Sequence, residues 1–115
     1  MVSTEFDRNA VRSPEKGSMF ARVAMLEGRP EQLEAGIRDY REHVVPEARK
    51  LAGFKGAYLL VDRKTGKNIS ITLWDSEKAE RDSAEAANKL RANASQIVSA
   101  SKPPVVGAYE IAVQG

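Results

Sequence analysis

Residues 53–76, GFKGAYLLVDRKTGKNISITLWDS, constrain the fold more than any other stretch, because two strands, a turn and a helix start follow one another there. Residues 58–61 and 69–74 are rich in β-branched, apolar and aromatic side chains, which favour strands. The polar residues 62–68 between them include Gly66, which can adopt the positive φ that a hairpin turn needs. We therefore predict a β-hairpin that leads into a helix.

The second strand of this hairpin alternates strictly between two kinds of side chain. Its apolar residues fall on one face, and its small polar residues and the tryptophan fall on the other: Ile69, Ile71 and Leu73 against Ser70, Thr72 and Trp74. We expect helices to cover the apolar face. We expect the mixed face to carry the functional residues.

The chain before the hairpin predicts one strand and one helix. Residues 20–27 alternate as a strand. Pro30 then suits a first helical turn, and apolar residues recur every three or four positions as far as Leu51. Pro46 should kink this helix or split it in two, because proline lacks the N–H of a helical hydrogen bond. Gly53 ends the helix.

The chain after the hairpin predicts a second helix and a last strand. Ser76 can cap a helix that continues to Val98, with alanines along the first half of its buried face. Residues 101–104 interrupt it, and residues 105–113 alternate as a strand in which Tyr109 shares a side with two aliphatic residues.

The resulting order βαββαβ predicts an α+β fold of the ferredoxin-like type. Such a fold has a four-stranded antiparallel sheet with both helices packed on one face. The other face then has no cover. We expect it to expose Phe20, Leu26 and Trp74, an apolar patch that proteins normally bury in a partner. A homodimer that packs sheet to sheet is the simplest way to cover it.

The length of 115 residues fits one domain, which we place at residues 19–115. Residues 1–18 show no sustained hydrophobic period and predict a flexible arm, and its end, Gly17-Ser18-Met19, resembles the junctions that expression vectors leave. The absence of cysteine excludes disulfides and thiol catalysis. No apolar run reaches the ~20 residues of a membrane span, and no signal peptide is visible, so we expect a cytoplasmic protein.

The charge pattern does not indicate a nucleic-acid surface, and the sequence shows no catalytic or metal-binding motif. The 18 basic and 16 acidic residues are interleaved and leave a net charge of +2, so no basic surface stands out. Arg63, Lys64 and Lys67 form one short basic cluster, which we interpret as a solvated turn. The sequence contains no phosphate-binding glycine loop, no metal-ligand cluster and no Ser/His/Asp set.

Several segments together resemble the antibiotic biosynthesis monooxygenase type of dimeric α/β-barrel protein. They are the first strand with Gly28-Arg29-Pro30, the passage from Pro46 to Phe54, the Asp62 and Gly66 hairpin, and the junction 73–76. The resemblance covers residues 19–113. It implies a homodimer, and it implies either cofactor-free oxygenation of a small quinol-like or anthrone-like aromatic or a non-catalytic, ligand-binding or regulatory role.

This chain carries the family's functional residues at only some of the corresponding positions. Trp74 stands where these oxygenases carry a tryptophan at the end of the third strand, but Ser70 replaces the asparagine of the aromatic-substrate enzymes. Haem degraders of this type need a histidine on the second helix and an asparagine on the first strand. This chain has its single histidine, His43, on the first helix, and Arg22 and Ala24 on the strand, so haem degradation is disfavoured.

We therefore predict one ligand pocket per subunit, bounded by Arg22, Ser70, Thr72 and Trp74, with no metal and no cofactor. It would be open near the helix that Ser76 caps. Small side chains beside one large aromatic would leave an apolar cavity with a few hydrogen-bonding groups.

The individual roles within this pocket have alternatives. Trp74 is expected to stack on a planar aromatic or to pack at the dimer interface. Arg22 would stabilise an oxyanion or form an ion pair with the partner subunit. Tyr58 would bind substrate or pack in the core, and a one-residue shift of the hairpin register would exchange it for Leu59. His43 is interpreted as a surface residue.

Overall fold

The structure of the protein, a computed structural model, describes residues 18–115. All but the last residue of the predicted arm, 1–18, therefore lies outside the described residues. The elements follow in the order β1 (Phe20–Glu27), η1 (Pro30–Gln32), α2 (Leu33–Asp39), η2 (Tyr40–Val44), α3 (Val45–Arg49), β2 (Phe54–Val61), β3 (Lys67–Trp74), α4 (Glu77–Asp82), α5 (Ala84–Ile97) and β4 (Val105–Glu110). Both predicted strands of the hairpin and the first strand are confirmed.

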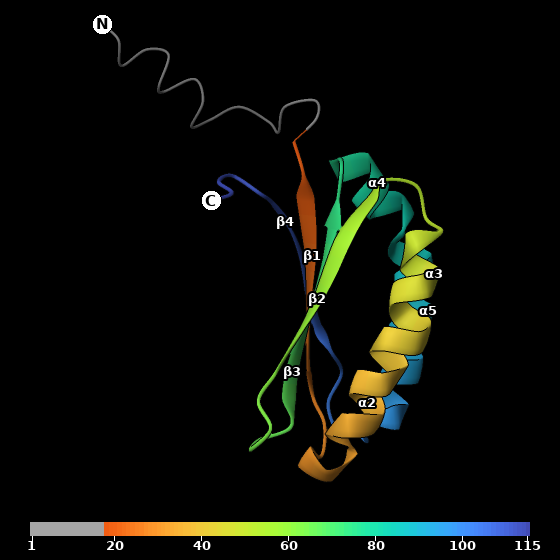
Figure 1. Ribbon diagram of the computed structural model, residues 1–115, viewed down its shortest axis with the longest axis vertical. Helices are drawn as coiled ribbons and strands as arrows, with labels where there is room; N and C mark the ends of the chain where they lie inside the picture. Colours follow the sequence, from red (N-terminus) through yellow and green to blue (C-terminus); the bar gives the residue numbers. More distant parts are fainter. Residues whose placement is uncertain (1–17) are drawn as a thin grey trace, which may run out of the picture.

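The four strands form one sheet in the order β2-β3-β1-β4, and every neighbouring pair is antiparallel. The helices form a single layer against one face of this sheet, and the other face carries no helix (Figure 1). The predicted ferredoxin-like α+β fold is thus confirmed. Among the described residues, no helix combines the length and the apolar character needed to cross a membrane.

The β2–β3 hairpin is fixed by its own turn and by the end of β1. The carboxylate of Asp62 accepts a hydrogen bond from the backbone N–H of Lys64 (2.9 Å). Gly66 has a φ of +82°, as the turn requires, and its carbonyl accepts a hydrogen bond from the N–H of Gly28 (3.1 Å). The hairpin tip is therefore tied to the turn that leads from β1 into the first helical segment.

The first helical region is divided in the way that Pro46 suggested. Between α2 and α3 the chain widens into a π-helical turn, η2, in which the N–H of Val45 bonds to the carbonyl of Tyr40. Pro46 follows directly and has no N–H to give to the carbonyl four residues earlier. Turns of this kind are frequent at functional sites.

The second helical region is also divided, which the sequence did not indicate. Ser76 caps α4 as predicted, because its hydroxyl accepts a hydrogen bond from the N–H of Ala79 (3.0 Å). The region then breaks at Ser83, whose buried hydroxyl donates to the carbonyl of Glu80 (2.7 Å) and accepts from Arg22 (2.9 Å). A tertiary contact from β1 therefore accompanies the break.

Two expectations about the faces of the sheet are wrong. Phe20, Leu26 and Trp74 are buried among the described residues, at 6%, 7% and 1% exposure, instead of lying on the uncovered face. The mixed face of β3 points toward the helices, and the apolar face with Ile69 and Ile71 points away from them. The error arose because period-2 alternation separates two faces without saying which one the helices cover.

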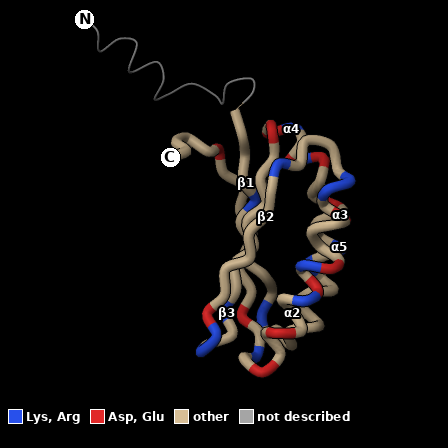
Figure 2. Tube along the Cα trace, in the orientation of Figure 1, with Lys and Arg blue, Asp and Glu red and all other residues tan. Residues whose placement is uncertain are grey.

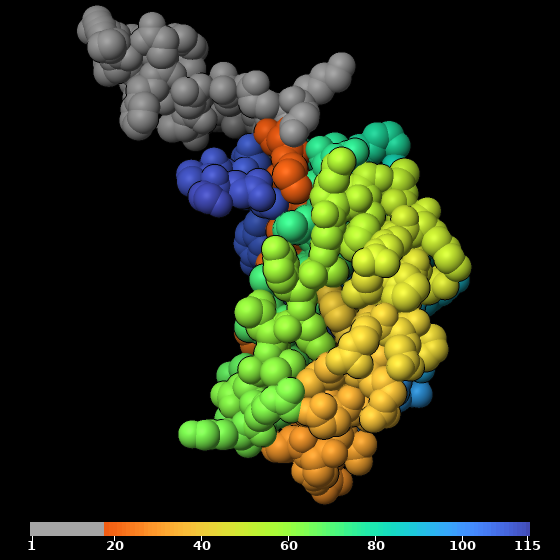
Figure 3. Space-filling view, viewed as in Figure 1, coloured from red at the N-terminus to blue at the C-terminus, as the bar shows by residue number. Residues whose placement is uncertain are grey.

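The uncovered face of the sheet is nevertheless apolar. Tyr58, Leu60, Val105 and Tyr109 are 61%, 49%, 71% and 59% exposed. Figure 2 shows charged residues along the helices and at the turns, whereas most of the sheet is uncharged. On the other side, α3 lies against β2 (Figure 3). An unpaired apolar sheet face thus remains, made of other residues than those expected.

Candidate functional site

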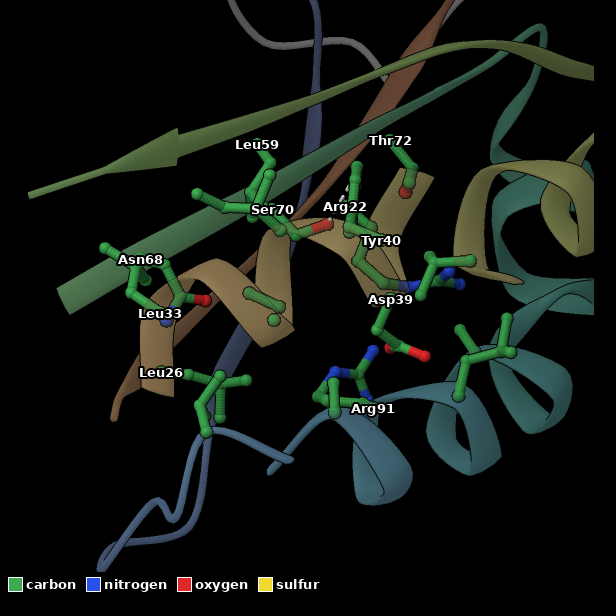
Figure 4. Close-up of a pocket in the computed structure, with 18 residues that line it drawn as sticks. Arg22, Leu26, Leu33, Asp39, Tyr40, Leu59, Asn68, Ser70, Thr72 and Arg91 are labelled. Carbon is green, nitrogen blue, oxygen red and sulfur yellow. Dashed lines mark hydrogen bonds between the residues drawn. The ribbon is translucent and has the colours of Figure 1, made fainter. Parts of the chain in front are cut away.

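A cavity of about 80 Å³ lies between the helix layer and the sheet (Figure 4). Strands and helices both contribute polar groups to its largely apolar wall: Arg22 from β1, Asn68, Ser70 and Thr72 from β3, Asp39 and Tyr40 from the first helical region, and Arg91 from α5. Aliphatic side chains, among them Leu26, Leu33, Leu59 and Leu90, supply the rest. This composition is typical of a small-molecule site.

The cavity suits a ligand of one or two rings. A water molecule needs roughly 10–15 Å³ of such space, so about six waters fit, which corresponds to about 180 Å³ of liquid. The space exists because Ala24, Ser70 and Ala87 present small side chains where a core would normally carry large ones. The helices that roof it approach closely at one end, where a Cβ on Gly36 would lie 2.5 Å from Val98 Cγ1.

Arg22 is the most firmly held polar group of the site. Its Nη2 donates to the carbonyl of Glu80 (2.6 Å) and to the hydroxyl of Ser83 (2.9 Å), and it lies 2.9 Å from the Glu80 carboxylate. The side chains of Arg22 and Glu80 are only 6% and 11% exposed. These contacts give the buried guanidinium a fixed orientation on the cavity wall and a counter-charge.

Trp74 packs against Arg22 and is not among the residues that line the cavity. Its ring lies 5.6 Å from Cζ of Arg22, and its Nε1 donates to the hydroxyl of Thr72 (3.0 Å). Phe54 packs edge-on against the same ring, with the centroids 5.6 Å apart. Trp74 thus orients two residues of the cavity wall.

Tyr40 places a phenol at the cavity from the π-helical turn. Its hydroxyl shares a hydrogen bond with the hydroxyl of Ser70 (2.9 Å) and donates to the carbonyl of Tyr58 (3.1 Å). Burial raises the pKa of Tyr40, and the hydrogen bond with Ser70 lowers it by less. The phenol is therefore held in its neutral form.

Two charged groups face the cavity from the helix layer. Asp39 is buried, with a side-chain exposure of 6%, and its Oδ1 lies 3.0 Å from Nδ1 of His43. Arg91 is half-buried on α5, and its Nη1 donates to the side-chain oxygen of Asn88 (2.7 Å). Burial lowers the pKa of Arg91, and the positive charge of Arg22 lowers it further.

The structure brings together some of the predicted site residues and separates others. Arg22, Ser70 and Thr72 line one cavity, whereas Trp74 lies behind its wall. Tyr58 is 61% exposed on the uncovered face, so the placement expected for it is wrong, and Leu59 lines the cavity instead. The hairpin has the shifted register that the sequence left open.

Four polar residues of the cavity wall were not predicted from the sequence. Asn68 lies one alternation before Ser70 on the same strand face, and it is buried with its amide nitrogen 3.3 Å from the carbonyl of Gly66. Tyr40 is part of the apolar stripe of the first helical region. Asp39 and Arg91 are charged residues next to such stripes, and only their positions in the fold reveal them.

Comparisons with solved structures identify the fold. A monooxygenase from the gene ActVA-Orf6 of Streptomyces coelicolor, solved in complex with nanaomycin D, superposes with a TM-score of 0.66 at 18% identity, over 87% of this chain and 90% of that one. A putative antibiotic biosynthesis monooxygenase from Nitrosomonas europaea gives 0.65 at 13% identity, over 90% and 100%. The chain has the fold of the antibiotic biosynthesis monooxygenases.

Other proteins with this fold add to the comparison. SnoaB, a cofactor-independent oxygenase from Streptomyces nogalater, gives a TM-score of 0.59 at 20% identity, over 85% of this chain and 96% of that one. A dimeric ferredoxin-like protein from an uncultured marine organism gives 0.64 at 11% identity, over 85% and 91%. At these identities, the likeness to antibiotic biosynthesis monooxygenases is one of fold.

Sequence comparison finds relatives that are named as uncharacterized proteins. No protein-family model matches the chain. The uncharacterized protein Rv2558 of Mycobacterium tuberculosis is 34% identical over 77 residues, which are 66% of this chain. The matched segment spans 33% of that relative, so the chain corresponds to about a third of its length.

Proposed function

We propose that the protein is a cofactor-independent monooxygenase that acts on a small quinol-like or anthrone-like aromatic. The observation that carries this proposal is the cavity between the sheet and the helix layer, with a mostly apolar wall and polar groups at Arg22, Tyr40, Ser70 and Thr72. Its size fits a planar molecule of one or two fused rings. The shared fold with monooxygenases, one of them solved with nanaomycin D, supports the same proposal.

The proposed reaction needs no group beyond the substrate, O2 and the protein. A naphthohydroquinone that has lost a proton is electron-rich and can reduce O2 itself. One oxygen atom enters the product, a hydroxynaphthoquinone, in place of a ring hydrogen, and the other leaves as water with two hydrogens of the substrate. The guanidinium of Arg22, whose orientation Glu80 and Ser83 fix, would stabilise the negative oxygen that develops on the way.

The remaining polar residues would position the ring. Ser70 and Tyr40 form one hydrogen-bonded pair on the cavity wall, and the hydroxyl of Thr72 is held by Trp74. Trp74 is thus proposed as a positioning residue for Arg22 and Thr72, in place of a direct contact with substrate. Ser70 itself would hydrogen-bond the substrate oxygen where the related oxygenases carry asparagine.

We also propose that the functional unit is a homodimer. The face of the sheet opposite the cavity exposes Tyr58, Leu60 and Tyr109, and sheet-to-sheet packing of a second copy would cover them. In that arrangement the two cavities lie on the outer sides of the paired sheets.

Oxygen uptake tests the proposal. The purified protein, shown by elemental analysis and absorption spectra to carry no metal or flavin, should accelerate O2 consumption with a two-ring quinol such as 1,4-dihydroxynaphthalene. Binding of this compound without accelerated uptake would support the alternative, a binding or regulatory protein. Absence of both binding and uptake would contradict a ligand site for such aromatics.

A further inference from the structure

The charged groups around the cavity differ in how well each is compensated. Arg22 has the carboxylate of Glu80 at 2.9 Å, and Asp39 has the imidazole of His43 at 3.0 Å. Arg91 has neither. Among residues 18–115 its guanidinium contacts no carboxylate within ion-pair distance, and it donates a hydrogen bond to the uncharged amide of Asn88.

The guanidinium of Arg91 faces a cavity whose wall also carries the cation of Arg22 and the carboxylate of Asp39, and it forms no ion pair with that carboxylate. The lowered pKa of Arg91 has burial as its first cause and the charge of Arg22 as its second, so both the loss of water and a like charge disfavour the cationic form there. An arginine stays protonated in proteins. An anion in the cavity, and not loss of the proton, would therefore offset the electrostatic cost of this charge.

The geometry of Arg91 leaves donors for such an anion. Nη1 is occupied by Asn88, and no hydrogen bond among the described residues uses Nε or Nη2. These two atoms form one edge of the planar guanidinium, which matches the two oxygens of a carboxylate. Figure 4 shows Arg91 reaching from α5 toward the cavity, on the side opposite the strand residues Ser70 and Thr72.

We propose that the cavity ligand is an aromatic carboxylic acid whose carboxylate binds Arg91 while its rings lie against Ser70 and Thr72. This inference rests on the proposed function, because it assigns the substrate class of the same cavity. Asp39 faces the cavity too, but its Oδ1 is turned to Nδ1 of His43 at 3.0 Å, and its carboxylate lies beyond ion-pair distance of Arg91.

Matched ligands test this assignment by isothermal titration calorimetry on the full chain. Naphthalene-2-carboxylate and naphthalene-2-carboxamide have the same rings and nearly the same shape, but only the first is an anion at neutral pH. We expect the acid to bind about tenfold tighter than the amide, because a charge-assisted pair is worth about that factor. Equal affinities, or failure of the acid to bind, would overturn the proposal.

Variants of α5 then assign the effect to Arg91. Arg91→Gln should weaken binding of the acid about tenfold and leave the amide unchanged. Lys89→Gln removes the same charge from an exposed position two residues away and should change neither affinity. If Arg91→Gln does not fold, Arg91→Lys retains the charge without the planar edge and should still weaken acid binding several-fold.

The outcomes separate this inference from the proposed function. If the amide binds as well as the acid, or if Lys89→Gln and Arg91→Gln lower acid affinity equally, the role of Arg91 is wrong while the aromatic cavity stands. If neither naphthalene derivative binds, the cavity fails as a site for two-ring aromatics and both proposals fall together.

Discussion

The guanidinium of Arg22 lies 5.6 Å from the centre of the Trp74 ring, under the helix layer and beside the cavity. A buried arginine stacked on an aromatic ring is held by both the ring and its hydrogen bonds. The second helical region breaks where Ser83 meets this guanidinium. One residue of β1 thus links the sheet, the helix break and the candidate site.

The first prediction concerns the stability that depends on Arg22. Arg22→Met should lower the free energy of unfolding by about 3–5 kcal/mol, because it leaves the largely buried carboxylate of Glu80 without its partner. Urea denaturation followed by circular dichroism measures this change.

A matched control separates burial from charge. Arg29→Met removes an arginine that pairs with Glu31 at the surface, where both side chains are more than half exposed, and should lower the free energy of unfolding far less. Equal losses in the two variants would contradict a special role for the Arg22 network.

The second prediction concerns the uncovered face of the sheet. Tyr58→Asp should convert the protein to a monomer, since an unpaired carboxylate at an apolar interface costs several kcal/mol. Light scattering at micromolar concentration measures the mass. Ala92→Asp, on the exposed side of α5, should leave the dimer intact. A wild-type mass of one chain would end the dimer proposal.

Strand β3 shows most clearly what the sequence can and cannot predict. Its alternation correctly grouped Ser70 with Thr72, and the turn residues Asp62 and Gly66 correctly fixed the hairpin. Alternation could not tell which face the helices cover, so Trp74 was expected on the open face and lies buried. Such a choice depends on the packing of the whole molecule and not on a local period.

The same limit explains the residues that were missed at the site. Tyr40 belongs to a helical apolar stripe and Arg91 lies next to one. A stripe indicates core without showing where the core leaves a cavity. The break at Ser83 depends on a contact with Arg22, 61 residues away. The helix propensities of neighbouring residues cannot indicate a contact between residues so far apart in the sequence.

The third prediction concerns the volume of the cavity. Ser70→Leu should fill it and abolish binding of a small aromatic while the dimer remains. Quenching of Trp74, the single tryptophan of the chain, provides the binding signal. Ser70→Ala keeps the volume but loses the hydrogen bonds to Tyr40 and to the substrate, so it should weaken binding without abolishing it, with a stability loss of about 1 kcal/mol. Undiminished binding to Ser70→Leu would place the ligand elsewhere.

The fourth prediction concerns alkaline pH. Burial raises the pKa of Tyr40 above its unfolded value, so the folded protein keeps this proton more tightly than the unfolded chain. The resulting stability is present below the unfolded pKa, about 10, and is lost as the pH rises through the folded pKa. Between neutral pH and the folded pKa of Tyr40, the free energy of unfolding of Tyr40→Phe should therefore fall less than that of the wild type.

An exposed tyrosine provides the control for this pH effect. Tyr58→Phe alters a side chain that is 61% exposed and should follow the wild-type curve. Urea unfolding at a series of pH values yields the three curves. If Tyr40→Phe runs parallel to the wild type, ionisation of the buried phenol is not coupled to folding.

The central claim is that the cavity between sheet and helices oxidises an aromatic with O2, and the most direct measurement is O2 uptake by wild type and Ser70→Leu side by side. With 1,4-dihydroxynaphthalene, whose two fused rings match the cavity, we predict uptake above the spontaneous rate for the metal-free and flavin-free wild type, and the spontaneous rate alone for Ser70→Leu. Equal acceleration by both proteins, or none by the wild type, would contradict the account.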